Sequence, residues 1–217
     1  PVHQFQKTAG GWRERLVDVS ENEAGPGFQF VLSDTPPEGD AVPMDLEDAG
    51  VGDIVETRPA ATALVREMAA RLNRHPGCVL FIDYGLSRRE YYSRARTAGT
   101  LRCHYRHRAH DDPFAWPGLQ DITAWVDFSQ LADAAERAHL QVSGYTTQAQ
   151  FLIAAGLDRQ FERAASADLA AQVRRAGQVR RLVMPGEMGE TFKAMALTRG
   201  SVNPPSGFAG KDLRRVL

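Results

Sequence analysis

The chain has 217 residues, of which 43% are hydrophobic and 24% are charged, and its formal net charge is −1. This composition is typical of a folded globular protein, and so small a net charge gives no long-range field to attract nucleic acid or an anionic membrane. No apolar run reaches the roughly 20 residues that a membrane-spanning helix needs. We therefore expect no nucleic-acid partner and no membrane insertion. The two cysteines, Cys78 and Cys103, suit a reducing compartment such as the cytoplasm better than a disulfide scaffold.

An antiparallel hairpin is predicted near the N-terminus, over about residues 11–33. "GWRERLVDV" alternates as a half-exposed strand does, "FQFVLS" is rich in β-forming residues, and "ENEAGPG" supplies glycine and proline for the reversal. Gly25-Pro26-Gly27 precedes a strand pattern rather than a helix, which argues against a nucleotide-binding loop. Residues 34–53 are polar, acidic and proline-containing, and are predicted to form a surface loop.

A helix followed by a strand comes next. The helix is predicted to begin at Pro59 and to end at "HPG", with Ala63, Leu64, Met68 and Leu72 on its apolar face. The run "VLFIDYG" predicts a strand that is buried on both faces of a helix-covered sheet. Together they favour a parallel α/β sheet.

Asp83 ends this predicted strand and is followed by Tyr84 and Gly85. Ligands of open α/β sheets bind at the carboxyl ends of the strands, so Asp83 is a candidate functional residue. Gly85 lets the backbone turn sharply or approach another group closely. The alternative is that Asp83 caps the next turn.

Further helices and strands are predicted towards the C-terminus. "DFSQLADAAERAHL" is a helical pattern that Asp127 or Ser129 would cap, and "QVSGYTTQ" is a strand pattern. Two helical stretches follow, "TQAQFLIAAGL" and "LDRQFERAASADLAAQVRRAGQVRRLV", and then a terminal strand, "ETFKAMALTR". Residues 1–200 are expected to form one domain and residues 201–217 a tail.

A histidine-rich stretch, "GTLRCHYRHRAHDDP", suggests a metal site. In a strand over residues 100–106, however, His104 and His107 would point to opposite faces, and no cysteine or glutamate cluster supplies a second pair of ligands. We therefore expect no metal site there, although a metal-dependent hydrolase that uses the cluster from His104 to Asp112 is kept as an alternative function. The sequence has no Gly-x-Ser-x-Gly elbow, which disfavours a hydrolase with a serine nucleophile.

Asp121 and Asp127 lie among apolar residues in "GLQDITAWVDFS". Carboxylates in such surroundings must find hydrogen-bond donors or shift their pKa, which makes both acids candidates for substrate binding. The alternative for Asp127 is a helix N-cap.

Several motifs, in order, resemble the second half of the MidA-like methyltransferases, a family that includes a mitochondrial arginine methyltransferase for complex I assembly. They are "PVHQFQKTAGGWRERLV", "FIDYG" with "EYY" after it, "GTLRCHYRHRAHDDPF", "GLQDITAWVDFS", "GYTTQAQFLIAAGL" and "PGEMGETFKAMAL". The resemblance implies a class I methyltransferase fold, a Rossmann-like α/β sheet with helices on both faces, and S-adenosyl-L-methionine as the cofactor. It also implies a protein substrate, such as a complex I subunit, with methylation of an arginine.

The family's glycine loop for the cofactor is missing from this sequence, which begins at Pro1 without a methionine. We therefore expect an excised or processed piece that lacks the N-terminal half of the fold, and no cofactor-binding residue is assigned. A bacterial protein of this kind would be cytoplasmic and a eukaryotic one mitochondrial, and a homodimer is compatible with the sequence.

A cationic guanidinium acceptor needs carboxylates around it. By residue type and position we assign Asp83, Asp121 and Glu187 as catalytic acids. The residues expected to orient these acids or the substrate are Tyr84, Gly85, His107, Asp127 and Gln148. The rival hypothesis is a non-catalytic assembly or scaffold protein on a methyltransferase fold, with its surface on the hairpin and on the helical stretch from Phe161 to Arg181.

Overall fold

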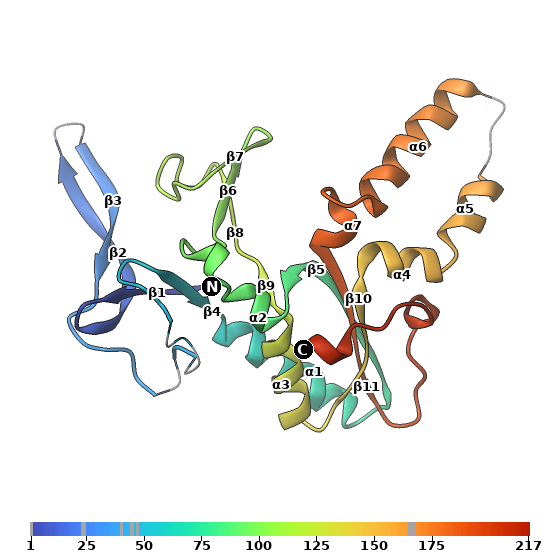
Figure 1. The fold of residues 1–217 in the computed structure, drawn as a ribbon, viewed down its shortest axis with the longest axis horizontal. Helices are drawn as coiled ribbons and strands as arrows, with labels where there is room; N and C mark the ends of the chain where they lie inside the picture. The colour runs from blue at the N-terminus through green and yellow to red at the C-terminus, as the bar shows by residue number, and fades with distance from the viewer. Residues whose placement is uncertain (1, 23–24, 40, 44–45, 47, 165–167) are drawn as a thin grey trace. The chain divides into compact units, whose positions relative to one another are not determined.

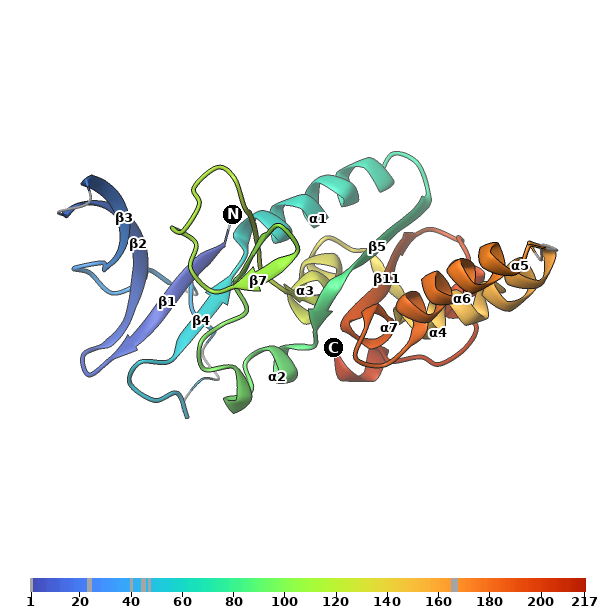
Figure 2. The same ribbon diagram turned by 90° about the horizontal axis from the view of Figure 1, so that it is seen from above.

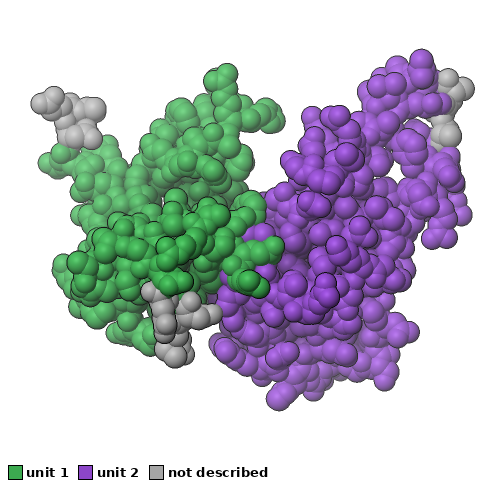
Figure 3. Space-filling model, in the orientation of Figure 1, with its two compact units in different colours: residues 1–60, 89–125 green, residues 61–88, 126–217 purple. Residues whose placement is uncertain are grey.

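The computed structural model describes residues 2–22, 25–39, 41–43, 46, 48–164 and 168–217. The chain forms two compact units (Figure 3). Unit 1 consists of residues 1–60 and 89–125, and unit 2 of residues 61–88 and 126–217. The predicted methyltransferase domain, residues 1–200, is therefore built from two units, and the polar stretch 34–53 belongs to the first of them.

Unit 1 contains an antiparallel sheet of order β3-β2-β1-β4 (Figure 1). Its strands are β1 (His3–Thr8), β2 (Gly11–Asn22), β3 (Gly25–Leu32) and β4 (Ile54–Thr57). The predicted hairpin is confirmed as β2 and β3, whereas β1 and β4 were not predicted. Gly25-Pro26-Gly27 lies in β3, where Pro26 pairs with Glu21, so these residues are strand rather than a phosphate-binding loop.

A second, smaller antiparallel sheet of unit 1 has the order β7-β6-β8. It consists of β6 (Arg102–Tyr105), β7 (Arg108–His110) and β8 (Asp121–Thr123), and is preceded along the chain by the short helices α2 (Arg88–Tyr91) and η1 (Arg94–Arg96). The expected strand over residues 100–106 is thus shorter. His107 lies in the turn after it, with φ of 65°. In the described residues, no three His, Cys, Asp or Glu side chains are grouped closely enough to hold a metal ion.

The sheet of unit 2 has the order β10-β11-β5-β9. Its strands are β5 (Gly77–Leu86), β9 (Val126–Asp127), β10 (Gln141–Thr147) and β11 (Phe192–Arg199). β5 runs parallel to β9, and β11 is antiparallel to both β5 and β10. The prediction of a parallel sheet is therefore wrong for most of the pairing, because β11 returns between β5 and β10. β5 and β10 still run in the same direction, as expected for two strands joined by a helix.

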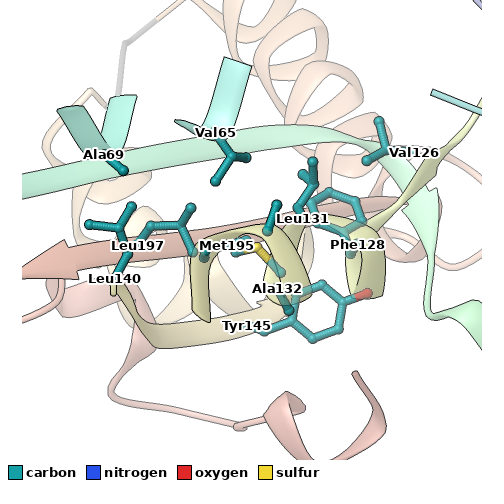
Figure 4. Close-up of a cluster of buried hydrophobic side chains, with 12 residues drawn as sticks. Val65, Ala69, Val126, Phe128, Leu131, Ala132, Leu140, Tyr145, Met195 and Leu197 are labelled. Atoms are coloured by element: carbon teal, nitrogen blue, oxygen red, sulfur yellow. The ribbon is translucent and has the colours of Figure 1, made fainter. Parts of the chain in front are cut away.

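The core of unit 2 lies between this sheet and two helices, α1 (Pro59–Leu72) and α3 (Phe128–Arg137) (Figure 4). Both helices begin where the sequence predicted. The buried face of α1, however, carries Val65 and Ala69, while Leu64 is 45% exposed. The predicted apolar face of α1 is wrong by about one residue, because positions 61, 65, 69 and 72 form the stripe that faces the core.

β5 differs from the prediction in its burial. Along the strand, alternate residues are exposed, with Leu80 at 40% and Ile82 at 46%. The face that carries Phe81 packs against the core formed with α1 and α3. The prediction that the strand is buried on both faces is therefore wrong for the described chain, in which one face of β5 stays open.

The C-terminal part of unit 2 is helical up to β11. The helices are α4 (Gln148–Ala154), α5 (Leu157–Arg163), α6 (Leu169–Val183) and α7 (Met188–Thr191), and the short helices η2 (Ser206–Phe208) and η3 (Arg214–Val216) follow β11. The expected tail packs onto the unit, since the Phe208 ring lies 5.0 Å from that of Phe151 and Leu213 N donates to Tyr145 O. No described helix is both long and apolar enough to cross a membrane.

Candidate functional site

One edge of the unit 2 sheet gathers most of the predicted site residues. β9, β5 and β10 run in one direction, so their carboxyl ends lie at the same edge. Asp127 ends β9, Asp83 to Gly85 lie near the end of β5, and Gln148 follows β10 directly. The antiparallel β11 begins at this edge beside the end of β5 (Figure 2). This is the edge at which open α/β sheets bind their ligands.

Asp83 lies opposite Lys193, its partner in the antiparallel pairing of β5 with β11. The Asp83 side chain is partly buried, and its Oδ1 accepts a hydrogen bond of 2.8 Å from Tyr84 N. Lys193 is 8% exposed, and its Nζ donates to Glu190 O at 2.5 Å. The sequence did not single out Lys193 as a site residue. Tyr84 packs edge-on against Phe192, with 5.3 Å between the ring centroids.

Gly85 is needed because two neighbours approach its backbone closely. A Cβ at this position would lie 2.3 Å from Val126 O and 2.8 Å from the ring of Phe128, which is fully buried. The sequence expectation of a close backbone approach is thus confirmed. The group that approaches is the neighbouring β9 strand together with the first residue of α3.

We expect Gly85→Ala to destabilise the protein by about 1–3 kcal/mol, because the methyl group would overpack against backbone and a buried ring. Gly177→Ala is the matched control, since nothing lies within 4 Å of a Cβ there and the residue is in the interior of helix α6. That control should gain up to about 1 kcal/mol from helix propensity. Thermal melting measures both changes. An unchanged melting temperature for Gly85→Ala would contradict this packing.

Asp127 is the N-cap of α3. Its Oδ1 accepts hydrogen bonds from Ser129 N at 2.9 Å and from Gln130 N at 3.1 Å, and Arg88 Nε lies 3.7 Å from Oδ2. Burial raises the pKa of the Asp127 carboxyl, and the Gln130 hydrogen bond, the Arg88 charge and the Ser129 hydrogen bond oppose that rise. The cap interpretation of Asp127 is therefore confirmed, and one of its two carboxylate oxygens is occupied.

We expect Asp127→Ala to cost about 1 kcal/mol of stability, the usual loss for a helix cap, and Asp127→Asn to cost much less because asparagine also caps helices. Urea denaturation gives both values. If asparagine were as damaging as alanine, the charge that faces Arg88, rather than the cap, would be what stabilises this end of the helix.

Gln148 and Glu187 are the remaining predicted residues of unit 2. Gln148 is 5% exposed, and its Nε2 donates to Leu182 O at 2.9 Å, which joins α4 to the end of α6. Glu187 precedes α7 without a side-chain capping bond and is exposed. Since α7 leads into β11, Glu187 lies in the loop that approaches the same sheet edge.

The other two predicted residues lie in unit 1. Asp121 is exposed at the start of β8, and His107 is exposed in the turn between β6 and β7. Six of the eight predicted residues therefore belong to unit 2, at or near one sheet edge, and these two do not.

Sequence reasoning missed Glu56, which is 1% exposed and is the most enclosed acid among the described residues of unit 1. Its Oε1 accepts from Gln4 Nε2 and Leu101 N, each at 2.9 Å, and its Oε2 accepts from Tyr91 and from the backbone and hydroxyl of Thr100. Burial and the Glu56 charge raise the pKa of the Tyr91 hydroxyl. The sequence signal was an acid within the short strand pattern "IVET". A cavity of about 490 Å³ lies beside this network.

The described residues do not fit an S-adenosyl-L-methionine site by themselves. Such a site needs a glycine loop that joins a strand to the N-terminus of a helix. The Gly25-Pro26-Gly27 stretch is paired strand, and the described chain offers no other glycine-rich junction of this kind. The cofactor therefore has no assigned residues here.

Comparison with known proteins identifies the family. A family model of S-adenosyl-L-methionine-dependent methyltransferases, Methyltransf_28, matches residues 1–146. The chain belongs to this family. The resemblance inferred from the sequence motifs is thereby confirmed, and so is the α/β methyltransferase fold class.

The methyltransferase relatives include a solved structure that matches all of this chain. It is a COG1565 superfamily member from Burkholderia thailandensis bound to S-adenosyl-homocysteine, 42% identical, with a TM-score of 0.90 over 100% of this chain and 55% of that one. Among curated proteins, "Protein arginine methyltransferase NDUFAF7, mitochondrial" of Danio rerio is 29% identical over 99% of this chain and 51% of its own length. The Mus musculus protein of that name is 34% identical over 91% and 43%. The chain thus spans about half the length of these relatives.

Proposed function

We propose that this chain forms the acceptor-binding part of an S-adenosyl-L-methionine-dependent protein methyltransferase. The observation that carries the proposal is the match of the whole chain to a structure with S-adenosyl-homocysteine bound, at 42% identity. In this proposal the methyl donor is held mainly by the part of the polypeptide that corresponds to the rest of the relatives' length. This chain supplies the sheet edge where the acceptor group is placed.

We propose arginine as the acceptor residue, because curated relatives of this chain are named protein arginine methyltransferases. A planar, permanently charged guanidinium is best held by carboxylates, and its nitrogen must lose a proton during transfer. Asp83 and Glu187 are the acids at or near the ligand edge of unit 2 that we propose to contact the acceptor, with Tyr84 and Gln148 at or near the same edge. In unit 1, Asp121 is still proposed as a catalytic acid, and His107 as a residue that orients the acids or the substrate.

We propose that Asp127 and Gly85 shape the site that holds the acceptor, and that neither contacts the acceptor as a charged group. Asp127 fixes the start of α3, and Gly85 lets β9 and Phe128 approach the end of β5. Positioning of this kind matters because methyl transfer to nitrogen requires the acceptor to lie in line with the donor sulfonium.

For the acceptor protein we propose a respiratory complex I subunit or a related protein, with the enzyme in mitochondria in a eukaryote and in the cytoplasm in a bacterium. The test uses the complete natural polypeptide, methyl-labelled S-adenosyl-L-methionine and purified complex I subunits. Acid hydrolysis of the product should release labelled methylarginine. Label in another amino acid would contradict the arginine assignment. A polypeptide that binds the subunits but neither binds S-adenosyl-homocysteine nor transfers label would instead be the non-catalytic assembly protein.

A further inference from the structure

Unit 1 contains a second cavity, of about 270 Å³, that the proposed function leaves without a role. Its lining comes from all four strands of the β3-β2-β1-β4 sheet and from residues between Ala98 and Pro113. Gln4 of β1 and Arg15 of β2 are cross-strand partners in this lining, and Phe30 of β3 lies next to them. We call this cavity the Arg15 groove.

Arg15 is held in place by its neighbours. Its Nη1 donates to Gln4 Oε1 at 2.8 Å, and Gln4 Nε2 in turn donates to Glu56 at 2.9 Å, so the amide is fixed from both ends. The guanidinium carbon lies 3.8 Å from the centroid of the Phe30 ring. A guanidinium that is stacked and hydrogen-bonded in this way is pre-organised for a planar ligand.

The rest of the Arg15 guanidinium has no acceptor in the described chain. Arginine offers five N–H donors, and among the described residues Gln4 provides the acceptor for one of them. The side chain is half-buried, and loss of hydration lowers the pKa of Arg15, although the Glu56 charge opposes this. Because Arg15 lines the groove and is partly buried, its other donors are only partly hydrated there.

The nearby acids are already engaged. Both oxygens of Glu56 accept hydrogen bonds from the Gln4, Tyr91, Thr100 and Leu101 donors. Glu56 therefore acts on Arg15 through its charge and through the Gln4 amide, and not by a direct hydrogen bond. Asp111, which also lines the groove, forms an ion pair with Arg102. The groove thus presents a cation whose open donors match the two oxygens of a carboxylate.

We propose that the Arg15 groove binds a carboxylate, which is carried by an acidic side chain of the acceptor polypeptide. The source of the carboxylate rests on the proposed function, because an acceptor protein is what the enzyme would have to recognise. The geometry of the site does not depend on that function. A free carboxylic acid would present the same two oxygens to Arg15.

The test measures binding rather than methyl transfer, so that it can succeed or fail independently of the proposed activity. Fluorescence anisotropy compares two labelled peptides on the complete natural polypeptide, a glutamate-rich arginine peptide and the same peptide with glutamine at each glutamate. We expect the acidic peptide to bind the parent protein about tenfold more tightly, the scale of one charge-assisted contact. Glutarate is the free-acid probe, tested as a competitor of the acidic peptide.

Arg15→Gln should abolish the preference for the acidic peptide, and Arg15→Lys should keep only part of it because lysine lacks the planar fork. Arg13→Gln is the matched control, since it removes the same charge from the same strand and Arg13 does not line the groove. Thermal melting of each variant checks that unit 1 stays folded.

The proposal is overturned if Arg15→Gln binds both peptides as the folded parent does, or if the parent protein shows no preference. Weakened S-adenosyl-homocysteine binding in Arg15→Gln would also overturn it, since the carboxylate would then be that of the cofactor. Displacement of the acidic peptide by an equal concentration of glutarate supports a carboxylate site but assigns it to a free acid. Displacement only at a large excess supports the acceptor side chain.

Discussion

Asp83→Asn in the complete natural polypeptide is expected to slow methyl transfer about a hundredfold, the scale for the loss of one preorganised electrostatic contact. Asparagine keeps the size of the side chain and an oxygen that accepts from Tyr84 N, as Asp83 Oδ1 does at 2.8 Å. It removes the charge that would hold a cationic acceptor. Rates at saturating cofactor, together with melting temperatures, measure the two effects separately.

Asp158→Asn is the control for Asp83, because it makes the same chemical change in the first turn of α5. It should leave both rate and melting temperature near the parental values. If Asp83 only caps the turn or balances the charge of Lys193 opposite it, the pattern reverses. The Asp83→Asn protein would then melt early and still methylate its acceptor at close to the parental rate.

Glu56→Gln is expected to destabilise unit 1 by about 3 kcal/mol or more, since each buried donor left without an acceptor costs about 1–3 kcal/mol. The carboxylate accepts from donors on Gln4, Tyr91, Thr100 and Leu101, and a glutamine would turn an NH₂ group towards some of them. The space around it is also restricted, because a Cβ on Gly99 would lie 2.7 Å from Glu56 Oε1.

Tryptophan fluorescence makes this prediction specific to unit 1. The three tryptophans of the chain, Trp12, Trp116 and Trp125, all belong to unit 1. In urea denaturation the fluorescence transition of Glu56→Gln should therefore move to lower urea, whereas Glu38→Gln, an exposed glutamate of the same unit, should not shift it. Coincident fluorescence transitions for Glu56→Gln and the parent would show that the network does not hold unit 1 together.

Local patterns predicted those parts of the fold that depend on nearby residues. The β2–β3 hairpin, the start of α1 at Pro59 and the Asp127 cap of α3 each have a local cause, such as alternation, a proline at the first turn or a capping side chain. The same logic placed Asp83 at the end of its strand, which is wrong by a few residues, because β5 continues to Leu86 and Asp83 pairs with Lys193 inside it. Asp83 still lies near the ligand edge of the sheet.

What the sequence could not predict depends on distant partners. β1 and β4 are short, and two of their buried residues, Gln4 and Glu56, are polar residues that satisfy each other across 52 positions. Alternation of apolar residues does not detect such strands. The insertion of β11 between β5 and β10 is likewise a matter of long-range pairing, and so is the groove around Arg15.

Calorimetric titration with S-adenosyl-homocysteine tests the central claim most directly, namely that this chain is the acceptor-binding part of a methyltransferase. The titration compares the 217-residue chain with the complete natural polypeptide. We expect saturable binding to the complete polypeptide and little or none to the chain alone, because the described residues form no glycine loop at a helix N-terminus. Equally tight binding to the chain alone would contradict the account.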